Sequence, residues 1–183
     1  MSIEQAYSNA IILVGYTRVG KSTVFNWLLN KVMTGAGAKK KSFYKLDQED
    51  EIGAAELGRT FTSVTMDPNV NPGFNTEKEV SLIDMAGFKD SRDHVGAIAV
   101  SYFLKSIFSK VRKAKFIIVI PESYLDEENG EGITKTFIGF IDMFPFGEMD
   151  KQTKTNLFNS LIMVVTKTKE DTEEHEKALE DIL

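Results

Sequence analysis

The stretch AIILVGYTRVGKSTVFNWLLN, residues 10–30, contains an apolar run, a loop bounded by glycines and a helical pattern in direct succession. Its centre, GYTRVGKS at residues 15–22, fits the spacing G-x-x-x-x-G-K-[ST]. This spacing is typical of a phosphate-binding loop when a strand precedes it and a helix follows it, and both flanks are present here. We therefore predict that residues 15–22 hold the phosphates of a nucleoside triphosphate.

The residue types in this loop suit that chemistry. The glycines allow backbone N–H groups to approach the β-phosphate closely, and the N-terminus of the following helix adds partial positive charge. Lys21 is expected to contact the β- and γ-phosphates, and the Ser22 hydroxyl is expected to ligate Mg²⁺. The nucleotide-binding residues predicted here are Gly15, Thr17, Arg18, Val19, Gly20, Lys21, Ser22 and Thr23.

A second motif follows the apolar run VSLID at residues 80–84. Asp84 ends this predicted strand, and Gly87 lies three residues later. An aspartate at the carboxyl end of such a strand holds Mg²⁺ in P-loop NTPases, usually through water. The N–H of a glycine three residues on can reach the γ-phosphate. We therefore predict Asp84 as a metal ligand and Gly87 as a sensor of the γ-phosphate.

Predicted strands and helices alternate along the rest of the chain. Continuous apolar runs predict buried strands at residues 10–15, 80–84, 115–120 and 160–166, and helical patterns occur at residues 21–33, 93–113, 132–144 and from residue 170 onward. This alternation predicts an α/β fold, namely a doubly wound, mostly parallel sheet with helices on both faces, in one domain over residues 1–183. Residues 34–79 predict a long polar loop that contains one short strand at 59–65.

The motifs together resemble the GTPases of the septin-like branch, and most closely the immunity-associated-protein (IMAP) GTPases. The likeness covers nearly the whole chain and rests on GYTRVGKSTVFNWLL, TSVT ending at Thr65, LIDMAGFKDS at 82–91, the segment from KFIIVI at 115–120 to residue 144, and IMVVTKTKED at 162–171. It implies a P-loop NTPase fold of the Ras-like G-domain type that binds GTP or GDP with Mg²⁺. It also implies that Thr65 closes over the metal and the γ-phosphate. The catalytic candidates are then Lys21, Thr65 and Gly87, and the metal ligands Ser22, Thr65 and Asp84.

The motif that reads the base has two possible registers. GTPases use [NT]-K-x-D after this strand, and the aspartate accepts hydrogen bonds from the guanine edge. Residues 166–169, TKTK, follow the strand at once but end in lysine, which cannot accept a hydrogen bond. Residues 168–171, TKED, supply the carboxylate two residues later, and we prefer this register. Its base-binding residues are Thr168, Lys169 and Asp171.

Phe88 follows the glycine of the second motif, where many small GTPases place a glutamine that orients the attacking water. Phenylalanine can neither donate nor accept, so we expect slow hydrolysis of GTP to GDP and phosphate, regulated by self-association or by an effector protein. Members of the resembled family often pair across the nucleotide face. A homodimer of that kind makes Arg18, Arg92 and His94 candidates for a group supplied in trans.

Two other functions stay open. A scaffolding subunit would bind nucleotide without hydrolysing it, and Phe88 favours this alternative. An ATP-dependent P-loop enzyme is weaker, because TKED points to guanine. The chain also stops at Leu183 without the further strand and helix that the resemblance implies. We expect a fragment of a longer chain, and a protein with an abbreviated base pocket is the alternative.

The composition excludes several other classes. A net charge of −5 and a pI near 5.2 indicate no nucleic-acid partner. The absence of cysteine excludes disulfides, thiolate metal sites and cysteine nucleophiles. No apolar run approaches the roughly 18 residues of a membrane span, and the first ten residues lack the pattern of a signal peptide. We therefore expect a soluble, cytoplasmic protein without a transmembrane segment.

Overall fold

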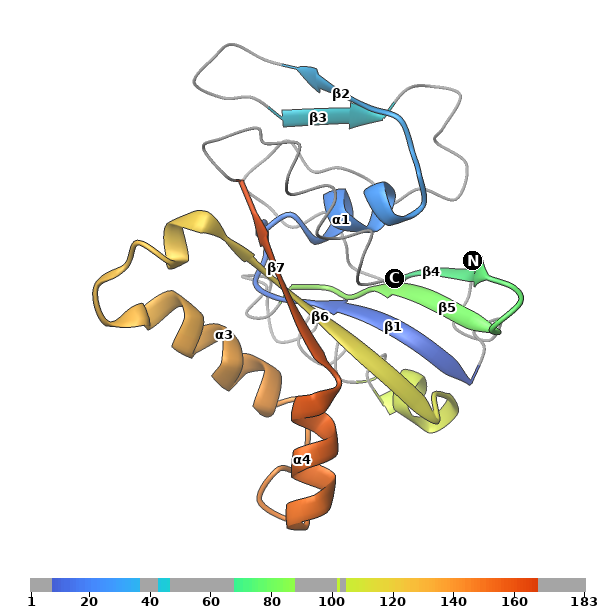
Figure 1. Cartoon of the computed structure of the whole chain (residues 1–183), viewed down its shortest axis with the longest axis vertical. Coiled ribbons are helices and arrows are strands. Elements are labelled where there is room, and N and C mark those ends of the chain that lie inside the picture. The colour runs from blue at the N-terminus through green and yellow to red at the C-terminus, as the bar shows by residue number, and fades with distance from the viewer. Residues whose placement is uncertain (1–7, 37–42, 47–67, 88–101, 103–104, 168–183) are drawn as a thin grey trace.

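The computed structural model describes residues 8–36, 43–46, 68–87, 102 and 105–167. A five-stranded sheet in the order β4-β5-β1-β6-β7 forms its centre (Figure 1). Strand β1 (Asn9–Val14) lies between β5 (Val80–Asp84) and β6 (Lys113–Pro121) and runs parallel to both. Strand β7 (Leu161–Thr166) continues the parallel part beside β6, and β4 (Asn69–Asn75) pairs antiparallel with β5. The predicted sheet, mostly parallel, is confirmed.

Helices cover both faces of this sheet, as predicted for a doubly wound fold. Helix α1 (Lys21–Leu28) packs on one face, over a buried layer that includes Leu13, Leu82 and Val119. The helical residues 105–110 and helix α3 (Glu131–Ile141) belong to the opposite face, over Ile12 and Ile118. Neighbouring residues of β1 thus enter different layers, because side chains alternate across a strand. Because both faces of the sheet are buried, the strand sequences are continuous apolar runs and do not alternate between apolar and polar residues.

Aromatic side chains fix α3 against the sheet. Phe116 of β6 meets Phe140 of α3 and Phe144 just beyond it, with ring centroids 5.1–5.6 Å apart. The rings meet edge to face, an arrangement that the quadrupole of an aromatic ring favours. Two short 3₁₀ turns, η3 (Glu122–Tyr124) and η4 (Glu128–Gly130), lead from β6 into α3. The start of α3 therefore lies near the carboxyl end of β6.

The long loop predicted for residues 34–79 is wrong in two places. Residues Met33–Ala36 (β2) and Phe43–Leu46 (β3) form an antiparallel pair, and β4 occupies Asn69–Asn75. Pro72 lies within β4, where the pairing with β5 is irregular between Asn71 and Asn75. An edge strand can contain proline because one of its sides needs no ladder hydrogen bonds. The residues around Pro72, which are typical of turns, therefore belong to an edge strand.

Helix boundaries also differ from the predictions. The helix predicted over 21–33 ends at Leu28, and Asn30 has the left-handed φ of 54° that asparagine tolerates better than most residues. The helix predicted over 93–113 is replaced at Lys113 by the start of β6, and the one predicted over 132–144 ends at Ile141. The predicted strand at 59–65, the residues 93–101 and the helix from residue 170 lie outside the described residues.

Helix α4 (Lys151–Asn159) was not predicted. None of its residues is fully buried, so it shows no apolar stripe in the sequence. Its local signal is Asp150, the N-cap residue, whose carboxylate accepts the Thr153 N–H at 2.8 Å. A capping aspartate before a polar helix is a weaker sequence signal than hydrophobic periodicity, but the sequence does contain it.

Candidate nucleotide-binding site

The loop of residues 15–22 lies at the carboxyl end of β1, between the ends of β5 and β6. The chain passes from β1 to β5 on one side and later to β6 on the other. Such a reversal of strand order leaves a crevice in which open α/β sheets bind ligands. Gly20 then precedes helix α1 with a φ of 106°, a left-handed value that suits glycine. The strand, loop and helix predicted from residues 10–30 are all present.

Lys21 is nearly buried, with 7% of its surface exposed. Its Nζ donates to the carbonyl of Tyr16, within the loop, at 2.9 Å. The side chain therefore folds back over the loop instead of extending into solvent. A buried ammonium group is costly unless it is paired or solvated, and an anionic ligand held by this loop would compensate its charge.

Ser22 and Asp84 meet at the start of α1. The Ser22 hydroxyl donates to Asp84 Oδ2 at 2.7 Å, and Asn69 of the edge strand donates more weakly to the same oxygen at 3.5 Å. Asp84 is fully buried, and burial raises the pKa of its carboxyl group, although Lys21, Ser22 and Asn69 act in the opposite direction. A carboxylate is therefore held in a position that disfavours its charge.

Two buried side-chain oxygens in the described part of the chain have no hydrogen-bond partner: Asp84 Oδ1 and Thr17 Oγ1. Buried polar atoms are normally satisfied, so these two point to groups that a ligand supplies. Both belong to the two motifs identified in the sequence. The unpartnered oxygens thus mark the same place as Lys21 and Ser22.

Gly87 contacts the loop directly. A Cβ atom added to Gly87 would lie 2.5 Å from Thr17 Oγ1 and 2.6 Å from Thr17 Cα. Real Cβ atoms do not approach other atoms so closely, so only glycine fits here without moving the loop. The second motif is therefore packed against the first, as its predicted role requires.

The end of β7 also holds the loop. The Thr166 hydroxyl donates to the carbonyl of Val19 and lies 3.2 Å from that of Ile120. Lys167, with a left-handed φ of 56°, donates its Nζ to the Arg18 carbonyl at 2.6 Å. Desolvation lowers the pKa of Lys167, and the nearby charge of Arg18 adds to this. Thr166 and Lys167 are the first two residues of TKTK, residues 166–169, which is the less favoured register for reading the base.

The family model of the 50S ribosome-binding GTPases matches residues 10–183 of this chain. The chain belongs to this family of P-loop GTPases. Membership implies that the domain binds guanine nucleotide, GTP or GDP, and it agrees with the α/β fold described above. A search of curated proteins finds no match to the chain.

The structure of this GTPase domain brings together most of the predicted site residues. The loop residues from Gly15 to Thr23 are contiguous, and Asp84 and Gly87 contact them from β5 and the residues after it. The remaining candidates lie outside the described residues: Thr65, Phe88, Arg92, His94, Thr168, Lys169 and Asp171. Their roles stay predictions.

Three contacts of the GTPase site were missed in the sequence. Asn69 was placed in a loop, Tyr16 was treated as a variable position, and Thr166 was weighed only as a base-reading residue. Only Thr166 could have been identified from the sequence, because it is the last residue of an apolar run and is followed by lysine. Nothing local to Asn69 or Tyr16 indicates its partner.

Two findings concern other kinds of site. In the described ranges, no helix is both long and apolar enough to cross a membrane. Among the same residues, no three His, Cys, Asp or Glu side chains gather as they would around a metal held by protein alone.

Proposed function

We propose that this GTPase domain is a guanine-nucleotide switch that binds Mg²⁺–GTP and hydrolyses it slowly to GDP and phosphate. The contact between Ser22 and Asp84, beside the buried Lys21, carries the proposal. A hydroxyl, a carboxylate and an ammonium group thus meet where the loop joins α1. This is the set of groups that a metal–triphosphate complex requires.

The residues present fit a magnesium ion. Mg²⁺ prefers oxygen ligands, and Asp84 offers an unpartnered oxygen next to the Ser22 hydroxyl. Ser22 would hold the ion directly and Asp84 would hold it through water, with Thr65 as a third proposed ligand. When bound, Mg²⁺ neutralises negative charge on the phosphate oxygens.

The chain's own residues supply the rest of the proposed chemistry. Lys21 exchanges the Tyr16 carbonyl for phosphate oxygens and stabilises the charge that develops on them. The loop amides and the N-terminus of α1 bind the same anionic group. Gly87 presents its N–H to the γ-phosphate, and loss of that phosphate would release the segment that follows. These steps orient the nucleotide but provide no base for the attacking water.

Slow hydrolysis follows from the side chain at position 88. Phe88 can neither orient nor polarise water, whereas a glutamine at that position does so in other GTPases. The resemblance to the IMAP GTPases supports this, together with pairing across the nucleotide face as a means of acceleration. Under this proposal the protein is cytoplasmic and passes its nucleotide state to an effector.

The test begins with the purified full chain. The protein is denatured, released nucleotide is identified by chromatography, and phosphate release is then followed with GTP and with ATP over a range of protein concentrations. GTP turnover per molecule that rises with protein concentration supports a dimer-activated switch. Bound nucleotide that neither exchanges nor hydrolyses would support a scaffolding subunit instead. Turnover of ATP alone would contradict both functions.

Arg18 provides a specific test of activation in trans. It is exposed, and its φ of 69° is one that glycine adopts without strain, so Arg18→Gly preserves the loop while it removes the side chain. If Arg18 acts on a partner's nucleotide, the ratio of turnover at high and low protein concentration falls to about one. An arginine supplied in this way contributes roughly 10³- to 10⁵-fold where it is used.

Arg18→Lys is the matched control, because it keeps the positive charge but loses the planar guanidinium group. Both variants are assayed for phosphate release at equal nucleotide occupancy. A concentration dependence that survives in Arg18→Gly assigns the trans role to another residue.

The register of the base-reading motif has its own prediction. Asp171→Asn replaces one acceptor oxygen with a donor, so it is expected to weaken GTP binding by about 1.5–3 kcal/mol, roughly 10- to 100-fold, and to leave ATP binding unchanged. Competition binding with GTP and ATP measures this discrimination. Asp181→Asn, in the same acidic segment, is the control. A discrimination that Asp171→Asn leaves intact would reject the register of residues 168–171.

A further inference from the structure

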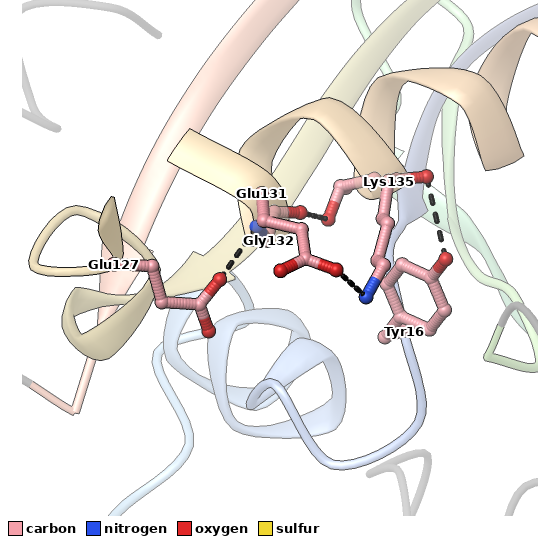
Figure 2. A network of polar contacts seen from close by, with 6 residues as sticks. Tyr16, Glu127, Glu131, Gly132 and Lys135 are labelled. Carbon is pink, nitrogen blue, oxygen red and sulfur yellow. Dashed lines mark hydrogen bonds and ion pairs between the residues drawn. The ribbon is translucent and has the colours of Figure 1, made fainter. Parts of the chain in front are cut away.

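Tyr16 connects the phosphate-binding loop to helix α3. It is the second residue of the loop, and its ring is partly buried against the apolar layer around α1. Its hydroxyl donates to the backbone carbonyl of Lys135, in the middle of α3, at 3.3 Å (Figure 2). The two residues are 119 positions apart in the chain. The loop is therefore joined to an element outside both sequence motifs.

The acceptor end of this contact is itself held in place. The N-cap residue of α3 is Gly130, which has no side chain to cap the helix, and the Glu127 carboxylate accepts a hydrogen bond from the Gly132 N–H at 2.6 Å instead (Figure 2). Thr136 is buried and donates to the Gly132 carbonyl at 2.8 Å. The first turns of α3 are thus held by contacts that do not involve Tyr16. The surface ion pair between Glu131 and Lys135 contributes little to this, because both side chains are exposed.

The backbone of Tyr16 has a second role. Its carbonyl accepts a hydrogen bond from Lys21 Nζ, the cation expected to bind phosphate. One residue therefore contacts the phosphate-binding lysine through its carbonyl and α3 through its hydroxyl. If α3 shifts, Tyr16 shifts with it, and so does the carbonyl that accepts from Lys21. Conversely, when Lys21 turns toward phosphate, the Tyr16 carbonyl loses its donor, and Tyr16 is the residue bonded to α3.

We propose that Tyr16 is a positioning residue, whose hydroxyl holds the phosphate-binding loop against helix α3 and thereby sets the affinity of the loop for guanine nucleotide. The proposal rests on the nucleotide site described above. It adds α3 to the elements that the bound phosphates influence. Under this proposal Tyr16 acts through the loop and not through a contact of its own side chain with the nucleotide.

The test replaces the hydroxyl alone. Tyr16→Phe keeps the ring and its packing, so the nucleotide-free protein is expected to show faster amide hydrogen exchange in residues 15–22 and around Lys135, with a nearly unchanged melting temperature. The dissociation constant for GDP is expected to rise about 3- to 10-fold, the range that the loss of one neutral hydrogen bond produces. The exchange measurement needs no nucleotide, so it tests the contact between Tyr16 and α3 separately from nucleotide binding.

Tyr124→Phe is the matched control. Tyr124 lies against Gly132 of α3 and near both Glu127 and Tyr16, but in the described part of the chain its hydroxyl makes no hydrogen bond to the loop. We expect this variant to behave as the wild type. Equal effects of Tyr16→Phe and Tyr124→Phe would overturn the proposal, because they would show a general response of the aromatic residues.

A double-mutant cycle separates positioning from plain packing. Glu127→Gln weakens the cap of α3, and we expect it to raise the GDP dissociation constant in the wild type but not in Tyr16→Phe, where the helix is already uncoupled from the loop. Additive effects of the two substitutions would overturn the proposal. Unchanged amide exchange in Tyr16→Phe would do so as well. A wild type that binds no guanine nucleotide would overturn the proposed function, whatever the exchange rates show.

Discussion

Replacing Lys21 with methionine is expected to weaken the binding of GTP by at least about 100-fold, and that of GDP by less, because GDP has no γ-phosphate. Lys21 is nearly buried, and within the loop its ammonium group donates to the Tyr16 carbonyl, an acceptor that a phosphate can displace. Each hydrogen bond to a charged group is worth about 1.5–3 kcal/mol, so GTP, which loses contacts to two phosphates, is bound more weakly by roughly 3–6 kcal/mol. That corresponds to about 100-fold or more in the dissociation constant.

The fold is expected to survive this substitution. Methionine has a similar unbranched shape and fills irregular gaps well, and the change removes a buried charge. The Tyr16 carbonyl loses a donor, which offsets part of that gain. Titration with GTP and with GDP, followed by the fluorescence of Trp27, the single tryptophan, measures both affinities, and thermal unfolding checks the fold.

Lys110→Met is the matched control for charge and shape. Lys110 is exposed just before β6 begins, at the opposite end of the sheet from the loop, so its removal leaves nucleotide binding unchanged. An affinity of Lys21→Met within a few-fold of the wild type would contradict the assignment of the loop as the phosphate site.

Asp84→Asn is expected to act in opposite directions on stability and on nucleotide binding. Asp84 is fully buried and its pKa is raised chiefly by desolvation, so the neutral amide removes a group whose charge the fold disfavours. The melting temperature of the nucleotide-free protein should therefore rise. The increase in GTP affinity that Mg²⁺ produces should fall by about 10- to 100-fold, the usual cost of losing an outer-shell carboxylate at a metal site.

The stability difference between Asp84→Asn and the wild type should depend on pH. Because the folded state of the wild type binds the Asp84 proton more tightly than the unfolded state does, its stability falls as pH rises from the ordinary aspartate pKa, about 3.9, through the raised folded value. Above that value the penalty is constant. Asparagine does not titrate, so the gain in melting temperature is largest at neutral pH and vanishes in acid.

Thermal unfolding of both proteins over this pH range, without nucleotide and with excess chelator, measures the effect. Ser22→Ala serves as a comparison, because it removes a hydrogen bond from the Asp84 carboxylate without removing its charge. A lower melting temperature for Asp84→Asn at neutral pH would mean that the carboxylate stabilises the nucleotide-free fold, against the burial argument.

Local patterns predicted the central part of the molecule well. The apolar runs became β1, β5, β6 and β7 within a few residues, because strands covered on both faces need continuous apolar residues. The edge strand β4 and helix α4 were missed, because neither shows the periodicity of a buried element. Pro72 and the surrounding turn signals are compatible with an edge, where tertiary pairing overrides local preference.

By itself the sequence determined the chemistry of the loop, because the residues from Gly15 to Ser22 are neighbours in the chain and their spacing alone arranges backbone amides, a cation and a hydroxyl before a helix. Only the tertiary structure decided what surrounds that loop. Asp84 reaches Ser22 across 62 residues, Tyr16 reaches α3 across 119, and Lys167 reaches Arg18 across 149. These contacts depend on the register of parallel strands and on the packing of α3 against β6, which no local pattern encodes.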